Sequence, residues 1–322
     1  MDVLYLREAE VERLLTMELA LEAVESAFRA AASGQVENHP RQRFHPSSGV
    51  YFHYMAAADQ ICGYFGVKLY TSSPTGTRFL VPLYRADTGA LVALLEADTL
   101  GRFRTGAASG VATKYMARAE AANVGILGSG HQAPTQLLAL DRVRRLTSVR
   151  VYSPSPERRR AFAEKMSGPL GLRVSAVESA EAAVREADIV VVVTSAKQPV
   201  LQGGWLAPGT HVNAVGANFP QKRELDDAVV ARAARIVVDS REQSRQEAGD
   251  LIAPFAGQPE RWNEVRELSE VVAGRFSGRA AAEEITLFKS NGVALEDVAT
   301  AARVYERARA EGVGQILKMW EK

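Results

Sequence analysis

The stretch that most constrains the fold is the eleven-residue run NVGILGSGHQA, from Asn123 to Ala133. A short apolar strand pattern breaks into glycines and then continues as a helical pattern to about residue 140. Gly128 permits a tight turn, Gly130 leaves room for a pyrophosphate against the backbone, and Ala133 lets the helix approach the strand closely. The free N–H groups at the helix start would face the phosphates. A glycine-rich turn without a ligand is the alternative, but the strand before it and the helix after it favour a dinucleotide site.

Strand and helix patterns alternate from residue 124 onward. Charged or small-residue helical patterns at 157–166 and 180–186 separate β-branched apolar runs, which is typical of a parallel, doubly wound sheet of the Rossmann type. The predicted strands of this nucleotide domain are residues 124–127, 149–153, 173–177, 188–194, 211–216 and 236–239.

The N-terminal third has a different pattern. Leu21, Val24, Phe28 and Ala31 recur at helical spacing, and Gly34 is a natural terminator. Strand-like stretches punctuated by glycine and proline follow, which predicts an antiparallel sheet or open barrel. These stretches are residues 50–55, 64–70, 79–84 and 90–96.

Two further helices bear on the domain organisation. Residues 105–118 are rich in small side chains, so this helix can pack closely against a neighbour. Residues 295–311 carry Val298, Ala302 and Tyr305 on one stripe with many charges opposite, and we expect this helix to pack back on the N-terminal part. The predicted division is a discontinuous α+β domain of residues 1–115 and 292–322, for substrate binding and dimerisation, and a dinucleotide domain of residues 116–291.

Charge and composition exclude several classes of protein. The net charge of +1 gives no indication of a nucleic-acid or membrane partner. Cys62 is the single cysteine, so no intrachain disulfide forms and a reducing, cytoplasmic setting is expected. The first residues do not read as a secretory signal, and the apolar run at 189–193 is far too short to cross a bilayer.

The residue at the end of the second strand of such a domain influences the choice of cofactor. An acidic residue there binds the ribose 2′-hydroxyl of NAD, but this chain has Ser153. Hydroxyls of Ser153 and Ser155, with the arginines 158–160 one turn on, could bind a 2′-phosphate, so NADP(H) is favoured and NAD(H) is possible. The alternative is that Arg158 and its neighbours only form a solvated helix face.

Several polar side chains are candidates for chemistry. Lys68 has apolar neighbours on a predicted strand and could line a cavity, although spacing alone favours a lysine on the wet face of the sheet. Arg104 stands before a helix start and suits a bidentate grip on a carboxylate. Arg41 and Arg43 are predicted to be loop cations, and His53 is more typically a packing residue. Asn218 follows the fifth strand, where ligands bind in such sheets. No spacing of histidines or cysteines predicts a metal site.

Taken together, these segments resemble the ornithine cyclodeaminase/mu-crystallin family over nearly the whole chain. The resemblance rests on residues 39–41, 66–70, 104–109, 128–133, 212–217, 223–226 and 285–292. It implies a homodimer built through the N-terminal domain. It also implies that Lys68 and Arg104, helped by Arg41, hold a substrate carboxylate. The predicted cofactor contacts are Thr105, Gly128, Ser129, Gly130, His131, Gln132, Ala133, Ser153, Ser155 and Arg158.

Two departures from the family pattern guide the expected activity. Deaminases of the family carry an aspartate where this chain has Asn218, and tend to have an acidic residue where it has His53. Asparagine can form hydrogen bonds but cannot shuttle protons. We therefore expect an NAD(P)H-dependent oxidoreductase that reduces the imine (ketimine) of a small 2-keto acid or oxidises the matching amino acid. Lys68, Arg104, Asn218 and His53 are its candidate catalytic residues.

Two other functions remain open at this stage. One is an ornithine cyclodeaminase-type ammonia lyase with tightly bound NAD. The other is a non-catalytic, NADPH-dependent protein that binds a small ligand. Lys68 and Arg104 favour an enzyme, but a binding protein could keep both to hold an acidic ligand.

Overall fold

The computed structural model describes residues 2–320. The chain divides into two compact units. Unit 1 comprises Met1–Thr105 and Gly292–Lys322, and unit 2 comprises Gly106–Asn291. The C-terminal boundary coincides with the predicted one at 291/292. The other lies ten residues before the predicted 115/116, inside the continuous helix α3 (Asp98–Met116).

Unit 1 is built on a seven-stranded sheet in the order β15-β1-β6-β5-β4-β3-β2. All its pairings are antiparallel except that between β1 and β6. The sheet is therefore open rather than a closed barrel. The strands are β1 (Asp2–Leu6), β2 (Val36–Ser47), β3 (Val50–Asp59), β4 (Tyr64–Ser73), β5 (Gly76–Arg85), β6 (Leu91–Glu96) and β15 (Gln315–Lys318).

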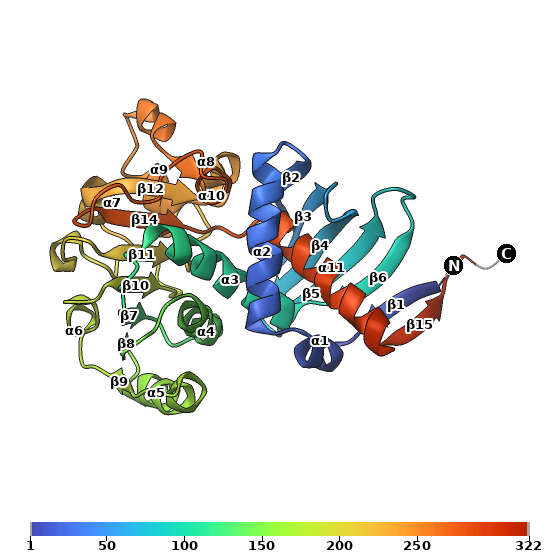
Figure 1. The fold of residues 1–322 in the computed structure, drawn as a ribbon, viewed down its shortest axis with the longest axis horizontal. Coiled ribbons are helices and arrows are strands. Elements are labelled where there is room, and N and C mark those ends of the chain that lie inside the picture. The colour runs from blue at the N-terminus through green and yellow to red at the C-terminus, as the bar shows by residue number, and fades with distance from the viewer. Residues whose placement is uncertain (1, 321–322) are drawn as a thin grey trace. The chain divides into compact units, whose positions relative to one another are not determined.

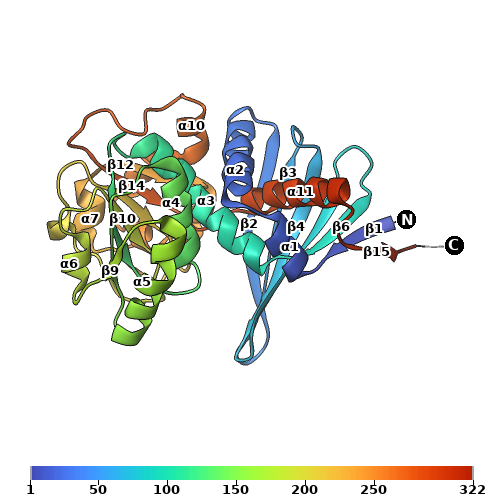
Figure 2. The ribbon, with the colours of Figure 1, turned by 60° about the horizontal axis from the view of Figure 1, so that its bottom comes forward.

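Three helices belong to this unit: α1 (Glu8–Leu14), α2 (Met17–Ala32) and α11 (Ala294–Glu311). Helices α2 and α11 lie across one face of the sheet (Figures 1 and 2). The predicted apolar stripe of α11, with Val298, Ala302 and Tyr305, is buried there. The C-terminal helix thus packs on the N-terminal part, as predicted.

The sequence prediction missed β2, because we assigned Arg41 and Arg43 to a loop. This edge strand is mostly polar, contains two prolines, and pairs with β3 with register shifts after His39 and after Phe44. Proline is tolerated at a sheet edge, where one side of the strand needs no ladder partner. The strand therefore lacks the apolar alternation that a sequence search detects.

Unit 2 contains the predicted parallel sheet. Its eight strands run in the order β13-β12-β14-β11-β10-β7-β8-β9, and every pairing is parallel. The strand order reverses between β7 and β10, the topological switch point where ligands bind in such sheets. The strands are β7 (Asn123–Leu127), β8 (Ser148–Tyr152), β9 (Val174–Ala176), β10 (Ile189–Val192), β11 (His211–Ala214), β12 (Ala233–Val238), β13 (Arg266–Glu267) and β14 (Ile285–Lys289).

Helices cover both faces of this sheet, each over its own apolar core. In Figure 2, α4 and α5 lie on one side and α6 and α7 on the other. The helices and 3₁₀ turns after α3 are α4 (Ala133–Val143), α5 (Pro156–Leu170), α6 (Ala180–Val184), η1 (Gly203–Trp205), α7 (Asp227–Arg232), α8 (Arg241–Glu247), α9 (Gly249–Ile252), η2 (Pro259–Asn263) and α10 (Leu268–Val272). The doubly wound fold predicted for this part of the chain is confirmed.

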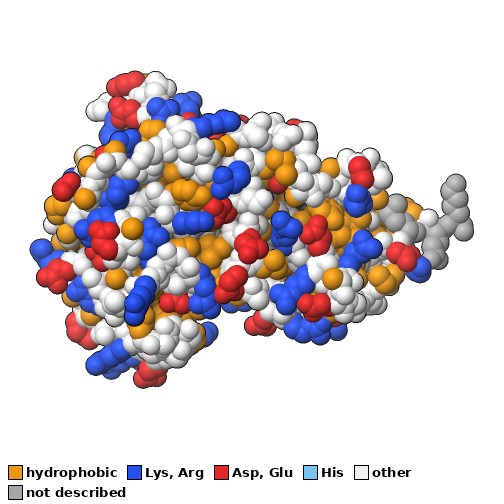
Figure 3. Space-filling model, viewed as in Figure 1, with side chains coloured by type: hydrophobic (Ala, Val, Ile, Leu, Met, Phe, Trp, Pro, Cys, Tyr) orange, Lys and Arg blue, Asp and Glu red, His pale blue; other side chains and the backbone are white. Residues whose placement is uncertain are grey.

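The surface carries charges of both signs. On the face shown in Figure 3, lysines and arginines alternate with acidic side chains, and no broad field of one sign forms. Within residues 2–320, no helix combines the length and the hydrophobicity that a membrane span requires.

The small residues of α3 allow a close approach to α4, as predicted. A Cβ atom built at Gly106 would lie 2.3 Å from the backbone oxygen of Thr135. We expect Gly106→Ala to lower the free energy of unfolding by about 1–3 kcal/mol, because backbone must shift to relieve the contact. Gly204→Ala is the control, since a Cβ there meets nothing within 4 Å. Chemical denaturation of both variants tests this, and equal stabilities would contradict it.

Candidate functional site

Three cations that the sequence analysis singled out come together in unit 1. Arg41 lies on β2, Lys68 on β4 and Arg104 in α3, and all three side chains are buried. Lys68 is only 3% exposed, so the expectation of a lysine on the wet side of the sheet is wrong. Burial of three cations in one region requires compensating negative charge.

Two carboxylates at the start of α11 supply that charge. Lys68 Nζ donates to Asp297 Oδ1 at 2.7 Å, and Arg104 Nε donates to the same oxygen at 3.1 Å. Arg104 Nη1 donates to Glu296 Oε2 at 2.6 Å. Both acids are fully buried, and their place in the first turn of α11 also suits the helix dipole.

Sequence analysis missed Glu296 and Asp297 because it placed the charges of this helix on its solvent face. The available signal was helical spacing. Asp297 precedes Ala301 by four residues and Tyr305 by eight, so it shares the buried stripe. An acid on an apolar stripe indicates a buried ion pair. Its partners here are Arg104 and Lys68, which lie 193 and 229 residues earlier in the chain.

A glycine makes room for this cluster. Gly292 has φ of +78°, and a Cβ there would lie 2.5 Å from Arg104 Nη1. Its carbonyl accepts a hydrogen bond from Arg41 Nη2 at 3.0 Å. Gly292 thus joins two of the cations. Its positive φ would strain any other residue, and a side chain there would displace the Arg104 guanidinium.

Burial shifts the pKa of Lys68 downward from 10.5 to about 8. Desolvation is the main cause, and the positive charges of Arg104 and Arg41 add to it, while Asp297 opposes it. The Nζ atom also lies 5.2 Å from the centre of the Phe79 ring. A lysine with such a pKa can hold or release a proton near neutral pH.

His53 lies on β3, two residues before Met55, which pairs with Lys68. It is buried and stacked on Tyr70, with ring centroids 4.2 Å apart. Burial, followed by the charges of Arg43 and Arg41, lowers the pKa of His53 to about 4. The imidazole is therefore neutral at physiological pH. Of these two candidate catalytic residues, Lys68 is the better proton donor near neutral pH.

The glycine-rich turn lies in unit 2, between β7 and α4. Gly128 has φ of +109°, and a Cβ there would come 2.4 Å from the backbone oxygen of Val193, so only glycine fits. Gly130 and His131 are exposed, and a Cβ at Gly130 would meet nothing within 4 Å. The turn therefore presents open backbone at the start of α4, as a pyrophosphate site requires.

The turn is fixed to the end of β8 by two serines. Ser129 Oγ donates to Ser153 Oγ at 2.8 Å. Ser155 caps α5 by accepting from the N–H of Arg158 at 3.2 Å, and its hydroxyl donates to Glu157 at 2.9 Å. The residues predicted to bind the adenosine ribose thus lie beside the residues predicted to bind the pyrophosphate.

The three arginines of α5 differ in their surroundings. Arg159 is buried and binds the carbonyl of Ser153 and the carboxylate of Glu178, so it has a structural role. Arg158 and Arg160 are exposed. Arg158, at the start of α5, stays the candidate for contact with a 2′-phosphate.

Asn218 is half-buried on the loop that follows β11. A buried network holds that loop: Glu224 accepts from Ala217 N at 2.9 Å and from Thr194 N at 2.6 Å. Lys289 Nζ, at the end of β14, donates to the Ala217 carbonyl at 2.5 Å. The loop is thereby fixed at the carboxyl edge of the sheet.

Thr105, a predicted cofactor contact, lies in α3. Its hydroxyl donates to the Gly101 carbonyl at 2.7 Å. Among residues 2–320, no three histidine, cysteine, aspartate or glutamate side chains are grouped so that they could hold a metal ion.

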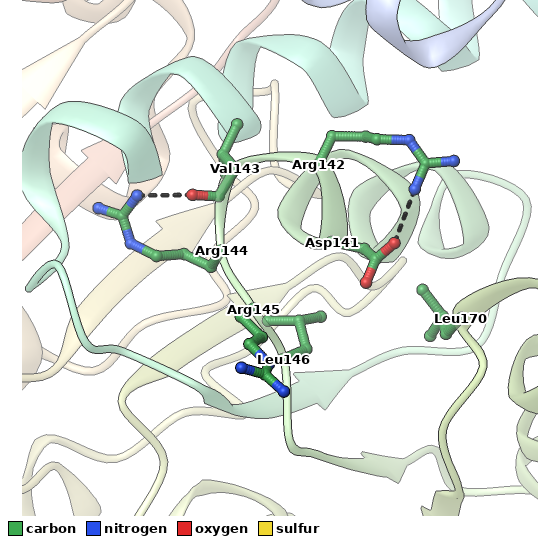
Figure 4. Close-up of a pocket in the computed structure, with 7 residues that line it drawn as sticks. All are labelled: Asp141, Arg142, Val143, Arg144, Arg145, Leu146 and Leu170. Carbon is green, nitrogen blue, oxygen red and sulfur yellow. Dashed lines mark hydrogen bonds and ion pairs between the residues drawn. The ribbon is translucent and has the colours of Figure 1, made fainter.

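An open pocket of about 560 Å³ lies at the C-terminal end of α4 (Figure 4). Two of its arginines form hydrogen bonds within the protein. Arg144 donates to carbonyls at the end of α3, including Thr113 O at 2.9 Å, and Arg142 pairs with Asp141. This pocket is separate from the glycine-rich turn and contains none of the predicted site residues. Its lining consists of Asp141, Arg142, Val143, Arg144, Arg145, Leu146 and Leu170.

Comparison with known proteins gives consistent matches over nearly the whole chain. The model of the ornithine cyclodeaminase/mu-crystallin family matches residues 1–312. The Δ1-pyrroline-2-carboxylate reductase of Thermococcus litoralis, solved with NADH and L-proline, is 38% identical with a TM-score of 0.93 and covers 97% of this chain and 99% of its own.

Two other solved structures have the same TM-score and slightly lower sequence identity. An archaeal alanine dehydrogenase dimer with bound NAD is 35% identical, with a TM-score of 0.93 and coverage of 99% and 100%. The iminosuccinate reductase of Paracoccus denitrificans, solved with NAD⁺, is 33% identical with the same TM-score and coverage of 99% and 100%.

The open space at Gly130 allows the turn to be tested separately from the fold. We expect Gly130→Ala to weaken dinucleotide binding at least about tenfold, because a methyl group would occupy the place of the pyrophosphate. The melting temperature without cofactor should stay within about 1 °C of the parent, since the methyl group meets no protein atom. Fluorescence titration with NADH and NADPH measures the affinity, and unchanged affinity would argue against a pyrophosphate at this turn.

Proposed function

This chain belongs to the ornithine cyclodeaminase/mu-crystallin family, and we propose that it reduces the imine of a small 2-oxo acid with a nicotinamide cofactor, or oxidises the matching amino acid in reverse. Three relatives that cover nearly the whole chain are named as reductases or dehydrogenases of such compounds. The proposal assigns substrate binding to the cationic cluster of unit 1 and cofactor binding to the glycine-rich turn of unit 2.

The observation that carries the proposal is the gathering of three buried cations in unit 1. Arg41, Lys68 and Arg104 are each at most 6% exposed, and Lys68 and Arg104 meet at one oxygen of Asp297. The carboxylate of a 2-imino acid is an anion that such a group of cations can bind. Arginine suits a bidentate grip on a carboxylate, which would fix the neighbouring carbon in place.

Lys68 is the proposed proton donor. A bound nicotinamide supplies the hydride, and an imine accepts hydride more readily once its nitrogen is protonated. Because the pKa of Lys68 is lowered to about 8, its ammonium can give up a proton near neutral pH at modest cost.

The residues of the turn fit a dinucleotide, and we favour NADP(H) over NAD(H). The residue directly after β8 is Ser153 and not an acid, and exposed Arg158 lies at the start of α5 beside Ser155. The named relatives were solved with NADH or NAD⁺, so use of NADH is part of the same test.

We further propose that the protein is a homodimer built through unit 1. One of the relatives is a dimer. In this chain β2 and β3 expose neighbouring aromatic side chains: Phe44 is 51% exposed and Tyr54 39%, and Phe52 lies near both. Exposed apolar groups of this kind are typical of an interface with another chain.

The proposal is tested with a panel of imines and both reduced cofactors. The panel is Δ1-pyrroline-2-carboxylate, pyruvate with ammonium, and oxaloacetate with ammonium, followed by nicotinamide absorbance. We expect turnover of the monocarboxylates, and a loss of at least about 100-fold in kcat for Lys68→Ala, since general acid catalysis contributes that much. Ornithine with NAD⁺ serves as the control. Ammonia and proline formed without net change of cofactor, together with no imine reduction, would exclude the reductase.

The position after β8 gives an independent test of cofactor choice. Ser153→Asp should lower the ratio of kcat/KM with NADPH to that with NADH at least about tenfold. The carboxylate of the aspartate would then repel the 2′-phosphate of NADPH. Ser153→Asn is the uncharged control. If the aspartate variant kept the parent ratio, the 2′-phosphate would not be bound near Ser153.

A further inference from the structure

We propose that Asp297 is a positioning residue that holds Lys68 and Arg104 at a fixed separation and keeps the Lys68 ammonium protonated until the imine takes its proton. The inference deepens the proposed function and rests on it. Asp297 acts through Lys68 and need not touch the substrate.

The geometry places one carboxylate oxygen between two cations. Asp297 Oδ1 accepts from Lys68 Nζ at 2.7 Å and from Arg104 Nε at 3.1 Å. These two cations come from β4 and α3, whereas the acid comes from α11. A single oxygen thus fixes the distance between the groups that would bind the carboxylate and donate the proton.

Helix α11 is itself held in place, so this oxygen has little freedom. The N–H of Leu295 donates to Asn38 Oδ1 on β2 at 3.1 Å. One residue beyond Asp297, Val298 packs on β4, where a Cβ at Gly66 would lie 3.3 Å from Val298 Cγ2. A fixed carboxylate can position Lys68 more precisely than a flexible one.

The charges around Lys68 explain why the ammonium needs this acid. Arg104 faces it from α3 and Arg41 from β2, and Asp297 on α11 is the carboxylate that touches it. On β3, Met55 pairs with Lys68, and His53, which is neutral, lies two residues before Met55. Strand β5 contributes the Phe79 ring. Without Asp297, a buried ammonium would face two guanidinium groups, and it would lose its proton at a lower pH.

Glu296 provides a matched control. It precedes Asp297 on the same helix, is equally buried and also binds Arg104, at 2.6 Å. Lys68 pairs with Asp297, and the main charges that shift the pKa of Lys68 are those of Arg104, Asp297 and Arg41. Loss of either acid disturbs Arg104, but only loss of Asp297 removes the carboxylate of Lys68.

The test is the pH dependence of kcat/KM for imine reduction, with one substrate and all variants. In the parent, kcat/KM should fall as pH rises through about 8, because Lys68 then loses its proton. We call this fall the alkaline limb of the pH profile. Asp297→Asn should move the limb to lower pH by at least about one unit, which is the shift in pKa that loss of a neighbouring opposite charge causes. Glu296→Gln should raise KM and shift the limb less than Asp297→Asn does, because Glu296 pairs with Arg104 whereas Asp297 pairs with Lys68 directly.

A purely structural role for Asp297 predicts a different result. Asp297→Asn would then lower stability and the amount of active enzyme, but the limb would stay at the parental pH. That outcome, or an equal shift in Glu296→Gln, would overturn the inference. Asp297→Glu keeps the charge and should retain a limb near the parental one.

Thermal unfolding keeps the inference testable if Asp297→Asn is poorly stable or if no imine is reduced. Lys68→Met removes the ammonium that Asp297 neutralises. The double variant Lys68→Met with Asp297→Asn should therefore melt at a higher temperature than Asp297→Asn alone. If the losses of melting temperature in the two single variants simply added up in the double variant, the pairing of Lys68 with Asp297 would be overturned. Absence of imine reduction in the parent would overturn the proposed function alone.

Discussion

The burial of Arg41, Lys68, Arg104, Glu296 and Asp297 together is the constraint on which the rest of unit 1 depends. Charges removed from water are tolerated only when each has partners of opposite sign or hydrogen-bonding groups. Lys68 and Arg104 meet this requirement through Glu296 and Asp297, and Arg41 through the Gly292 carbonyl. The sheet therefore needs the start of α11 for electrostatic reasons as much as for its apolar stripe.

Unit 2 follows a different principle, in which backbone and small residues create the site. Its turn excludes side chains at Gly128 for steric reasons and leaves Gly130 open. The loop that carries Asn218 is held by Glu224 and Lys289, whose contacts join the ends of three parallel strands. Desolvation raises the pKa of Glu224 to about 7, and the Lys289 charge opposes that rise. A rigid edge of this kind suits a ligand that must be held in one orientation.

Sequence reasoning succeeded where a local pattern carries the information. The parallel sheet, the glycine-rich turn and the stripe of α11 follow from periodicity and turn chemistry, and the family resemblance is confirmed by the match over residues 1–312. It failed where long-range pairing decides. The edge strand β2, which carries Arg41, has no apolar alternation, and the buried acids Glu296 and Asp297 read as solvent charges until their partners are placed. Arg159 seemed available for a phosphate, yet a tertiary contact with Glu178 assigns it to the fold.

The division of the chain has a consequence for the order in which the protein is made. Unit 2 is an uninterrupted segment from Gly106 to Asn291, whereas unit 1 is completed only by Gly292–Lys322. A nascent chain emerging from the ribosome exposes Lys68 and Arg104 long before Asp297 has been synthesised, 229 residues after Lys68. During that interval the cations must stay hydrated. Unit 1 is therefore completed last, and a chain that stops short of α11 contains Lys68 and Arg104 but not the carboxylates beside which they are buried.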